Sequence, residues 1–158
     1  MTCIVFSAGV MAADSLLAAN GTRHGTMRKI ARSPSGTLGG AGGGCAAVEQ
    51  FLKQVEAGLL ERFALDLDDQ GFVGMLAHAD GTLHCVSATG LTWPILSGFA
   101  AIGTGADVAL GALHMGATAR EAVEAAIAFD TNCGGAIQIE LLDNGAIRPA
   151  PVKQWDVT

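Results

Sequence analysis

The sequence predicts an α+β domain in which two antiparallel sheets are stacked and helices cover their outer faces. Three observations lead to this class. Short extended segments are joined by tight turns. Amphipathic segments with helical periodicity separate the groups of strands. The resulting order of strands, helix, strands, helices and strands is the one expected for stacked sheets. The 158 residues contain no repeat or linker, so we expect one domain over 1–158.

The first strands are predicted from apolar runs interrupted by a turn. Residues 3–6 and 10–13 are mainly apolar and flank Ser7-Ala8-Gly9, a spacing typical of a tight hairpin. A third extended segment is expected over 26–32. It ends at Ser33-Pro34-Ser35-Gly36, where serine, proline and glycine favour a turn.

A short strand into Leu38 and a glycine cluster around Gly42 precede the first predicted helix. A helix with one apolar side needs a sheet to cover. Apolar residues recur after the cluster at the spacing of such a helix: Cys45, Val48, Phe51 or Leu52, Val55 and Leu59.

The middle of the chain returns to strands before its next helix. Residues 72–77 and 83–87 flank Asp80-Gly81, a strong hairpin signal. A helix is then expected over about 106–115, where small and apolar residues dominate.

The last helix and strand are predicted from end signals. Thr118 and Glu121 have the spacing of a capping box, so a helix should begin at Thr118. We expect it to stop near Asp130. A strand follows over 135–142, and Asp143-Asn144-Gly145 forms a turn before a polar tail.

Composition argues against several classes of function. The net charge of −6 at pH 7 and the absence of a basic stripe argue against nucleic-acid binding. The apolar start lacks the basic residues of a signal peptide and is interrupted at Asp14. No apolar run approaches the roughly 18 residues of a membrane span. We therefore expect a cytoplasmic protein without a membrane partner.

The four cysteines and four histidines do not have the spacing of a metal site. Cysteines never occur as C-x-x-C, and the histidines are isolated. Small buried thiols are the simpler interpretation, and we expect no metal and no cofactor. The cysteines are Cys3, Cys45, Cys85 and Cys133, and the histidines are His24, His78, His84 and His114.

Thr2 follows the initiator methionine, and removal of Met1 would make it the N-terminus. A free N-terminal threonine is a complete catalytic unit. Its Oγ is the nucleophile, and its α-amino group, with a reference pKa of about 7.7–8.0, can accept the hydroxyl proton near neutral pH. The alternative is an ordinary first residue with no chemical role.

The glycine run from Leu38 to Cys45 suits an oxyanion hole. Its backbone N–H groups are expected at a strand-to-helix junction, next to the partly positive end of the helix. Nucleotide binding is the competing interpretation, because Gly42-x-Gly44-x-x-Ala47 fits G-x-G-x-x-A. No βαβ unit and no phosphate-binding Gly-Lys-Ser/Thr sequence accompany it, so we reject that interpretation.

Six short segments in chain order resemble the conserved segments of proteasome β-subunits. In size the chain is most similar to the peptidase of the bacterial heat-shock-locus two-component protease. The segments are Thr2-Cys3-Ile4-Val5, Val10-Met11-Ala12-Ala13-Asp14-Ser15, Arg28-Lys29-Ile30, Ala41-Gly42-Gly43, Ile102-Gly103-Thr104-Gly105 and Asp130-Thr131-Asn132-Cys133-Gly134-Gly135-Ala136. Each is weak alone, but together they span nearly the whole chain.

This resemblance implies a fold, a reaction and an assembly. The fold would be a four-layer αββα sandwich of the N-terminal nucleophile hydrolases. The reaction would be threonine-dependent hydrolysis of peptide bonds, with Gly42 donating its N–H to the oxyanion. The subunits would form a homo-oligomeric ring that encloses polypeptide substrates, with a ring ATPase as partner.

Lys29 and Asp14 are expected to support Thr2. The Lys29 ammonium would stabilise the developing alkoxide and keep the pKa of the amine low enough for it to act as a base. A buried ammonium needs a partner, and Asp14 is the natural one. The alternative is a structural salt bridge, or two solvated charges.

Thr104, Asp130 and Cys133 would form the surrounding shell that binds the Thr2 amine and tunes its proton exchange. Cys133 stands where the resembled family has serine, and a thiol is a weaker hydrogen-bond partner. The segment 59–70 is also too short for the family's second helix, which puts the form of the ring in question. The small residues Ala19, Asn20, Gly21 and Ala31 are expected near the cleft and suggest little charge selection.

Two other functions remain open. One is an amidase of the same fold that acts on a small molecule. The other is a non-catalytic assembly protein that retains Met1 and uses the fold only to form a ring.

Overall fold

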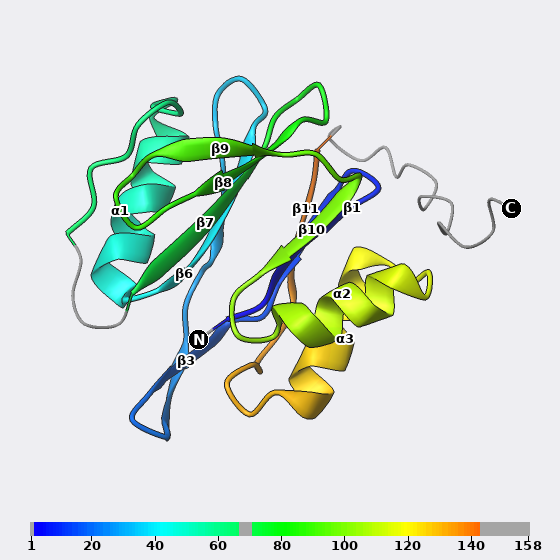
Figure 1. Cartoon of the computed structure of the whole chain (residues 1–158). Coiled ribbons are helices and arrows are strands. Elements are labelled where there is room, and N and C mark those ends of the chain that lie inside the picture. Colours follow the sequence, from blue (N-terminus) through cyan, green and yellow to red (C-terminus); the bar gives the residue numbers. More distant parts are fainter. Residues whose placement is uncertain (1, 67–70, 143–158) are drawn as a thin grey trace, which may run out of the picture.

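The computed structural model describes residues 2–66 and 71–142, and Figure 1 shows the arrangement of their helices and strands. It is an α+β fold in which every paired strand is antiparallel to its neighbour, which confirms the predicted class. The expected turn at 143–145 lies outside the described residues. No helix within them is long and apolar enough to cross a membrane.

One sheet has four strands in the order β10-β1-β2-β11. The predicted hairpin of β1 and β2 is present and lies at the centre of this sheet, and Ala8 and Gly9 both have positive φ in the turn between them. The bounds are β1 Ile4–Ser7, β2 Val10–Ala13, β10 Phe99–Ile102 and β11 Gln138–Leu141.

The second sheet has five strands in the order β5-β6-β7-β8-β9. It contains the hairpin predicted around Asp80-Gly81, which joins β7 to β8. The bounds are β5 Ile30–Arg32, β6 Leu38–Gly43, β7 Phe72–Ala77, β8 Leu83–Val86 and β9 Thr92–Ile95.

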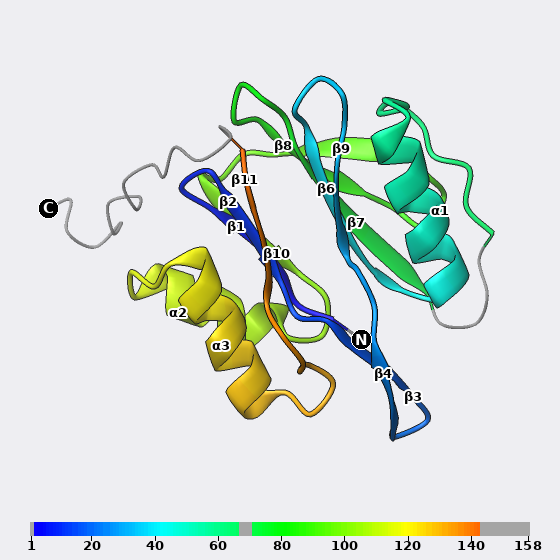
Figure 2. The ribbon, with the colours of Figure 1, turned by 180° about the vertical axis from the view of Figure 1, so that it is seen from behind.

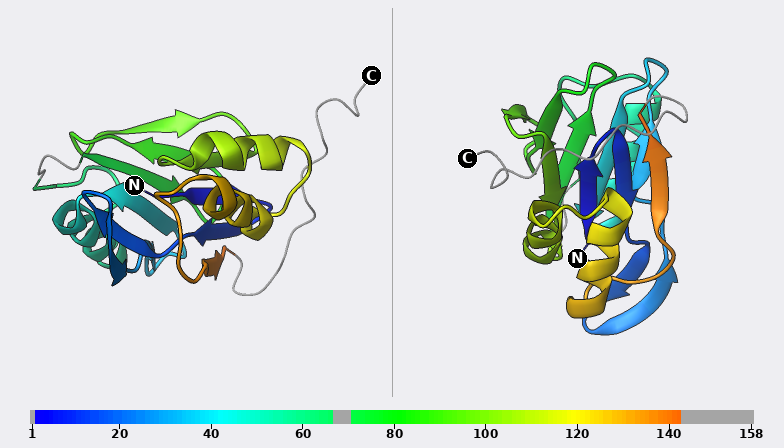
Figure 3. Two further views of the ribbon diagram at one scale, coloured as in Figure 1. Left: turned by 90° about the horizontal axis from the view of Figure 1, so that it is seen from below. Right: turned by 90° about the vertical axis from the view of Figure 1, so that its right-hand side faces the viewer.

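The two sheets pack face to face, and helices lie on their other faces (Figures 1 and 2). One core cluster lies between the sheets and includes Ile4, Met11, Leu38 and Met75. Helix α1 (Cys45–Glu56) packs on β5 and β6. Helices α2 (Ala106–His114) and α3 (Ala119–Phe129) pack on the four-stranded sheet, and each side has its own apolar cluster. Figure 3 shows the same stacking from below.

The helix start predicted at Thr118 is confirmed. Its hydroxyl accepts the N–H of Glu121, and the Glu121 carboxylate accepts the N–H of Thr118. The helix gives way to an extended residue at Asp130, as expected.

The first helix ends earlier than its apolar pattern predicts. It stops at Glu56, and Leu59 is 58% exposed beyond it. Gly58 has φ +80°, its N–H bonds to Val55 O, and the N–H of Leu59 bonds to Gln54 O. This is a Schellman ending, which the left-handed conformation of Gly58 makes possible.

The hairpin of β3 (Leu16–Ala19) and β4 (Thr22–Thr26) was not predicted. Asn20 and Gly21 both have positive φ in its turn, so the Asn-Gly signal was present in the sequence. The expected extended segment over 26–32 is divided, because β4 ends at Thr26 and β5 begins at Ile30.

The glycine cluster is a strand and not a loop before a helix. The prediction of a short strand into Leu38 was wrong because β6 continues through Gly43. Two positions of the cluster have no room for a side chain, because neighbouring side chains occupy the space that a Cβ would take: Val55 and Phe51 at Gly39, and Ile4 and Met11 at Gly40.

Three further strand predictions need correction. Strand β11 begins at Gln138 and not at 135, because Gly135 has φ +76° and turns beside Ser15. Strands β9 and β10 were not predicted. Strand β9 contains Pro94, which suits an edge strand.

Candidate active site

Thr2 lies two residues before the start of β1 and is buried, with 1% of its surface exposed. Its carbonyl oxygen accepts the N–H of Gly105 at 3.1 Å and the hydroxyl of Thr104 at 3.4 Å. These bonds come from the loop between β10 and α2. They fix the backbone of Thr2 against the end of the neighbouring strand.

Asp14 brings Thr2 and Lys29 together. Its Oδ1 accepts the hydroxyl of Thr2 at 3.0 Å, the ammonium of Lys29 at 2.9 Å and the N–H of Cys3 at 3.0 Å. Asp14 follows β2, and the hairpin returns it to the start of β1. The three residues that the sequence placed in one site therefore meet on a single carboxylate oxygen.

The second oxygen of Asp14 is bound by backbone alone. Oδ2 accepts the N–H of Gly134 at 3.1 Å and the N–H of Leu16 at 3.3 Å. Asp14 is fully buried, so these bonds replace the water that its charge has lost. The segment containing Gly134, more than a hundred residues away, thus helps to hold the carboxylate toward Thr2.

Lys29 is the largest fully buried side chain, with 2% of its surface exposed. Its ammonium pairs with Asp14, so the alternative of two solvated charges is wrong. The backbone N–H of Lys29 donates to Gln138 Oε1 at 2.8 Å, and Gln138 Nε2 donates to the carbonyl of Met27 at 2.7 Å. Sequence reasoning missed Gln138, because nothing nearby in the chain marks it.

Gly42 and Gly103 leave the space that Thr2 occupies. A Cβ on Gly42 would overlap the methyl group of Thr2, and one on Gly103 would overlap its carbonyl oxygen. Gly42 pairs with Val73 in the interior of the five-stranded sheet. The glycine run therefore lies at a strand-to-helix junction, as expected, but Gly42 itself belongs to the strand, because β6 ends at Gly43 and α1 begins at Cys45.

A cavity of about 310 Å³ opens beside Thr2. Its walls come from the five-stranded sheet, from Thr2 and from the loop between β10 and α2, and none of the residues is charged. They are Thr2, Gly42, Gly43, Phe72, Val73, Gly103 and Thr104. The sequence did not indicate Phe72 and Val73 as site residues.

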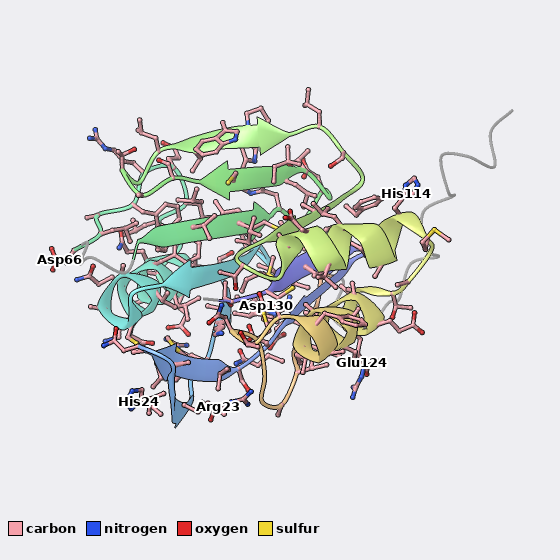
Figure 4. All side chains as sticks on the ribbon, turned by 60° about the horizontal axis from the view of Figure 1, so that its bottom comes forward. Arg23, His24, Asp66, His114, Glu124 and Asp130 are labelled. Atoms are coloured by element: carbon pink, nitrogen blue, oxygen red, sulfur yellow. The ribbon has the colours of Figure 1, made fainter. Side chains whose placement is uncertain are left out.

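Asp130 and Cys133 do not line the cavity beside Thr2. Burial opposes ionisation of Asp130, but hydrogen bonds from Asn132, Thr104 and Cys133 outweigh it and hold its pKa below the ordinary value. Burial, with the nearby carboxylates of Asp14 and Asp130, raises the pKa of Cys133 to about 12. The thiol donates to Asp130 at 3.6 Å, and Figure 4 shows Asp130 at the end of α3.

The small residues expected at the cleft lie elsewhere. Asn20 and Gly21 form the exposed tip of the β3–β4 hairpin, whose strand β4 carries Arg23 and His24, labelled in Figure 4. Ala31 is buried against α1. None of them lines the cavity beside Thr2.

Known proteins share this fold. Two solved structures of BPH from Thiobacillus denitrificans superimpose with a TM-score of 0.62 each, at 20% sequence identity. The matches cover 89% of this chain and 98% and 97% of theirs, and one of the two is a complex with epoxomicin. At this identity the likeness establishes the fold alone. No protein-family model matches the sequence, and no curated protein matches it.

The site combines a hydroxyl, a carboxylate and an ammonium without water-exposed charge. An ammonium held near a hydroxyl stabilises negative charge that develops on its oxygen. In the part of the chain that the structure describes, no group of three or more His, Cys, Asp or Glu side chains could hold a metal ion.

Proposed function

We propose that the protein is a threonine-type N-terminal nucleophile hydrolase that cleaves peptide bonds. The observation that carries this proposal is the buried carboxylate of Asp14, which binds the Thr2 hydroxyl and the Lys29 ammonium through one oxygen. A structural ion pair alone would not require the second residue of the chain to share that oxygen beside an open cavity.

The proposed reaction requires removal of Met1. The Thr2 Oγ attacks the carbonyl carbon of the substrate, and its proton passes to the α-amino group, directly or through one water. The oxyanion accepts the N–H of Gly42 and is stabilised by the charge of Lys29. Collapse breaks the C–N bond, and the leaving amine takes the proton. Water then hydrolyses the Thr2 ester and restores the hydroxyl.

The stacking of helices and sheets supports the four-layer αββα sandwich that this class of enzyme uses. Helix α1 covers one sheet, and α2 and α3 cover the other. We further propose that the subunits form a homo-oligomeric ring that receives unfolded polypeptide from a ring ATPase. The mass of the native particle tests the ring, and ATP-dependent degradation with a candidate ATPase tests the partner.

Intact mass and a peptide assay test the enzyme. We expect the mature protein to lack Met1 and to hydrolyse fluorogenic peptides. Thr2→Ala should abolish hydrolysis while leaving the particle mass unchanged, and Lys29→Ala should reduce turnover nearly as much. A protein of this fold has been captured with epoxomicin, so we also expect epoxomicin to inhibit the mature form.

Three results would contradict the proposal. Full activity of Thr2→Ala would remove Thr2 as the nucleophile. Retention of Met1 in the assembled protein would block the amine and favour the non-catalytic assembly protein. Thr2-dependent hydrolysis of small amides without any cleavage of peptides would favour the amidase.

A further inference from the structure

Cys85 on β8 and Trp93 on β9 lie directly opposite each other, and Val73 on β7 lies diagonally to Cys85. Val73 and Met75 are two apart on β7 and so face the same side of the sheet. Met75 pairs with Cys85 on β8, and Cys85 pairs with Trp93 on β9. We call Val73, Cys85 and Trp93 the apolar shelf.

The apolar shelf faces the space between the two sheets. Met75, Ala77 and Leu83 share its side of the sheet, and all three are buried in the cluster between the sheets. The shelf is the solvent-accessible part of this face of the five-stranded sheet. Val73 and Cys85 are partly exposed, and Trp93 is 49% exposed. The four-stranded sheet therefore covers the deep part of this side and leaves the shelf accessible.

The shelf is continuous with the cavity beside Thr2. Val73 lines that cavity and pairs with Gly42, the residue whose missing side chain makes room for Thr2. Side chains directly opposite on paired strands are about 4.5–5.5 Å apart at Cβ. Val73 thus lies one strand from the proposed nucleophile, and the shelf extends outward from it.

Neither the shelf nor the cavity carries a charge that could pair with a charged substrate. The cavity is lined by glycine, threonine, valine and phenylalanine. Cys85 is the shelf's one ionisable residue, and burial raises the pKa of its thiol, which therefore stays neutral. A charged side chain placed here would lose water without gaining a partner.

We propose that the apolar shelf binds an uncharged, apolar side chain of the peptide substrate next to the scissile bond, with Val73 and Trp93 as specificity-determining residues. This inference rests on the proposed function. Burial of one leucine-sized side chain on the shelf should raise kcat/KM by about 10- to 100-fold over a substrate with a charged side chain there. The substrate class is therefore a polypeptide segment with Leu, Ile, Val or Phe at this position.

Matched fluorogenic peptides test the preference. They differ only in carrying Leu, Lys or Glu at one residue on either side of the cleaved bond. We expect the Leu peptide to have a kcat/KM at least about tenfold higher than the Lys and Glu peptides at one of the two positions. Equal rates for the three residues at both positions would overturn the inference.

Charge-introducing variants test the residues. Trp93→Lys, at an exposed position on the edge strand, should lower kcat/KM for the Leu peptide and raise it for the Glu peptide relative to the Lys peptide. Val73→Lys should change these kcat/KM values in the same directions and by more, because Val73 lines the cavity beside Thr2. Trp93→Lys is informative even where Val73→Lys does not fold. Leu96→Lys is the matched control, because Leu96 is 95% exposed and lies outside the shelf.

The outcomes separate the inference from the proposed function. Cleavage that survives Thr2→Ala would remove the function and the inference with it. Cleavage that depends on Thr2, but whose Leu, Lys and Glu preference is the same in wild type, Trp93→Lys and Leu96→Lys, would overturn only the shelf.

Discussion

Gly42 leaves room for the side chain of Thr2, and any other residue would fill that room. The sequence marked Gly42 as a donor to the oxyanion, which stays a prediction. The structure adds a steric reason for glycine at this position that holds even without substrate, because a Cβ would overlap the Thr2 methyl group. The same residue can have both roles, since a backbone can approach a reacting group closely only where no side chain intervenes.

Gly42→Ala should reduce turnover by about 100-fold or more, because a displacement near 1 Å of a reacting group has that effect. The measurement is kcat/KM on the best peptide, together with a melting curve to confirm folding. Gly111→Ala is the matched control, since nothing lies within 4 Å of its added Cβ. Wild-type turnover in Gly42→Ala would show that Thr2 does not need its present position.

Asp14→Asn should lower the free energy of unfolding by about 3–5 kcal/mol, because Lys29 would keep its buried charge and lose its counter-ion. Urea unfolding measures the change. Glu124→Gln is the control: its pair with Arg120 is exposed on α3 and should contribute less than about 1 kcal/mol. Equal, small changes in the two variants would mean that the Asp14–Lys29 pair is not buried in solution.

At the scale of elements, end signals decide where the helices begin and stop. The capping box of α3 and the Schellman endings of α1 and α2 act over three to six residues, so they can be read from the sequence. At α2, the N–H of Gly116 bonds to Leu113 O and that of Ala117 to Ala112 O. The spacing of apolar residues alone predicted that α1 extends to Leu59, because that spacing does not reveal that Gly58 ends the helix.

Thr118→Ala should destabilise the protein by about 1 kcal/mol, since the N–H of Glu121 would lose its acceptor. The change should appear as a lower midpoint in urea unfolding with an unchanged slope. Thr131→Ala, an exposed threonine beyond the same helix, should be close to neutral. A Thr118→Ala midpoint equal to that of wild type would indicate that water replaces the cap without cost.

His78, at the end of β7, should make stability depend on pH. Burial, with a smaller contribution from neighbouring His84, lowers its pKa below 6.5, while Asp80 acts in the opposite direction. Its ring also contacts the Thr37 hydroxyl at 3.4 Å. The folded state then binds fewer protons than the unfolded state, so this contribution is fully present above pH 6.5 and is lost as the pH falls below it.

His78→Gln should therefore flatten the decline of unfolding free energy between pH 7.5 and about pH 5.5. The measurement is a series of urea unfolding curves for wild type and variant in matched buffers. Titrating groups far from His78 contribute equally to both proteins, so the difference reports on His78 together with its coupling to His84 and Asp80. Parallel declines in the two proteins would contradict a lowered pKa at this position.

At the scale of the whole molecule, contacts between the two sheets hold the site together. Gln138 belongs to β11 of the four-stranded sheet and binds the backbone at Met27 and Lys29, which lead into β5 of the other sheet. Arg32 of β5 pairs with Glu140 of β11 along the same boundary. The position of the Lys29 ammonium therefore depends on how the sheets are stacked.

Gln138→Ala should cost about 1–3 kcal/mol of stability, because two partly buried backbone groups lose their partners. It should also lower kcat more than it raises KM, since Gln138 does not line the cavity. Gln138→Glu keeps the acceptor for Lys29 N–H and should recover part of kcat. Loss of stability with an unchanged kcat would limit Gln138 to a structural role.

Features that depend on neighbours within a few residues could be predicted from the order of amino acids. These are the first hairpin, the Asp80-Gly81 turn and the start of α3, and the α+β class followed from the order of such elements along the chain. The sequence also indicated Thr2, Asp14 and Lys29 as one group, through a resemblance and not through geometry. The Asn20-Gly21 hairpin was equally available, because its turn chemistry is local.

Which distant residues meet could be seen only in the folded protein. The fold placed the glycine cluster inside a strand, set Val73 opposite Gly42, and brought Gln138 to the backbone of Lys29. Residues in such contacts can be more than a hundred positions apart in the chain. Their meeting depends on strand register and on the stacking of the two sheets, which no short stretch of sequence encodes.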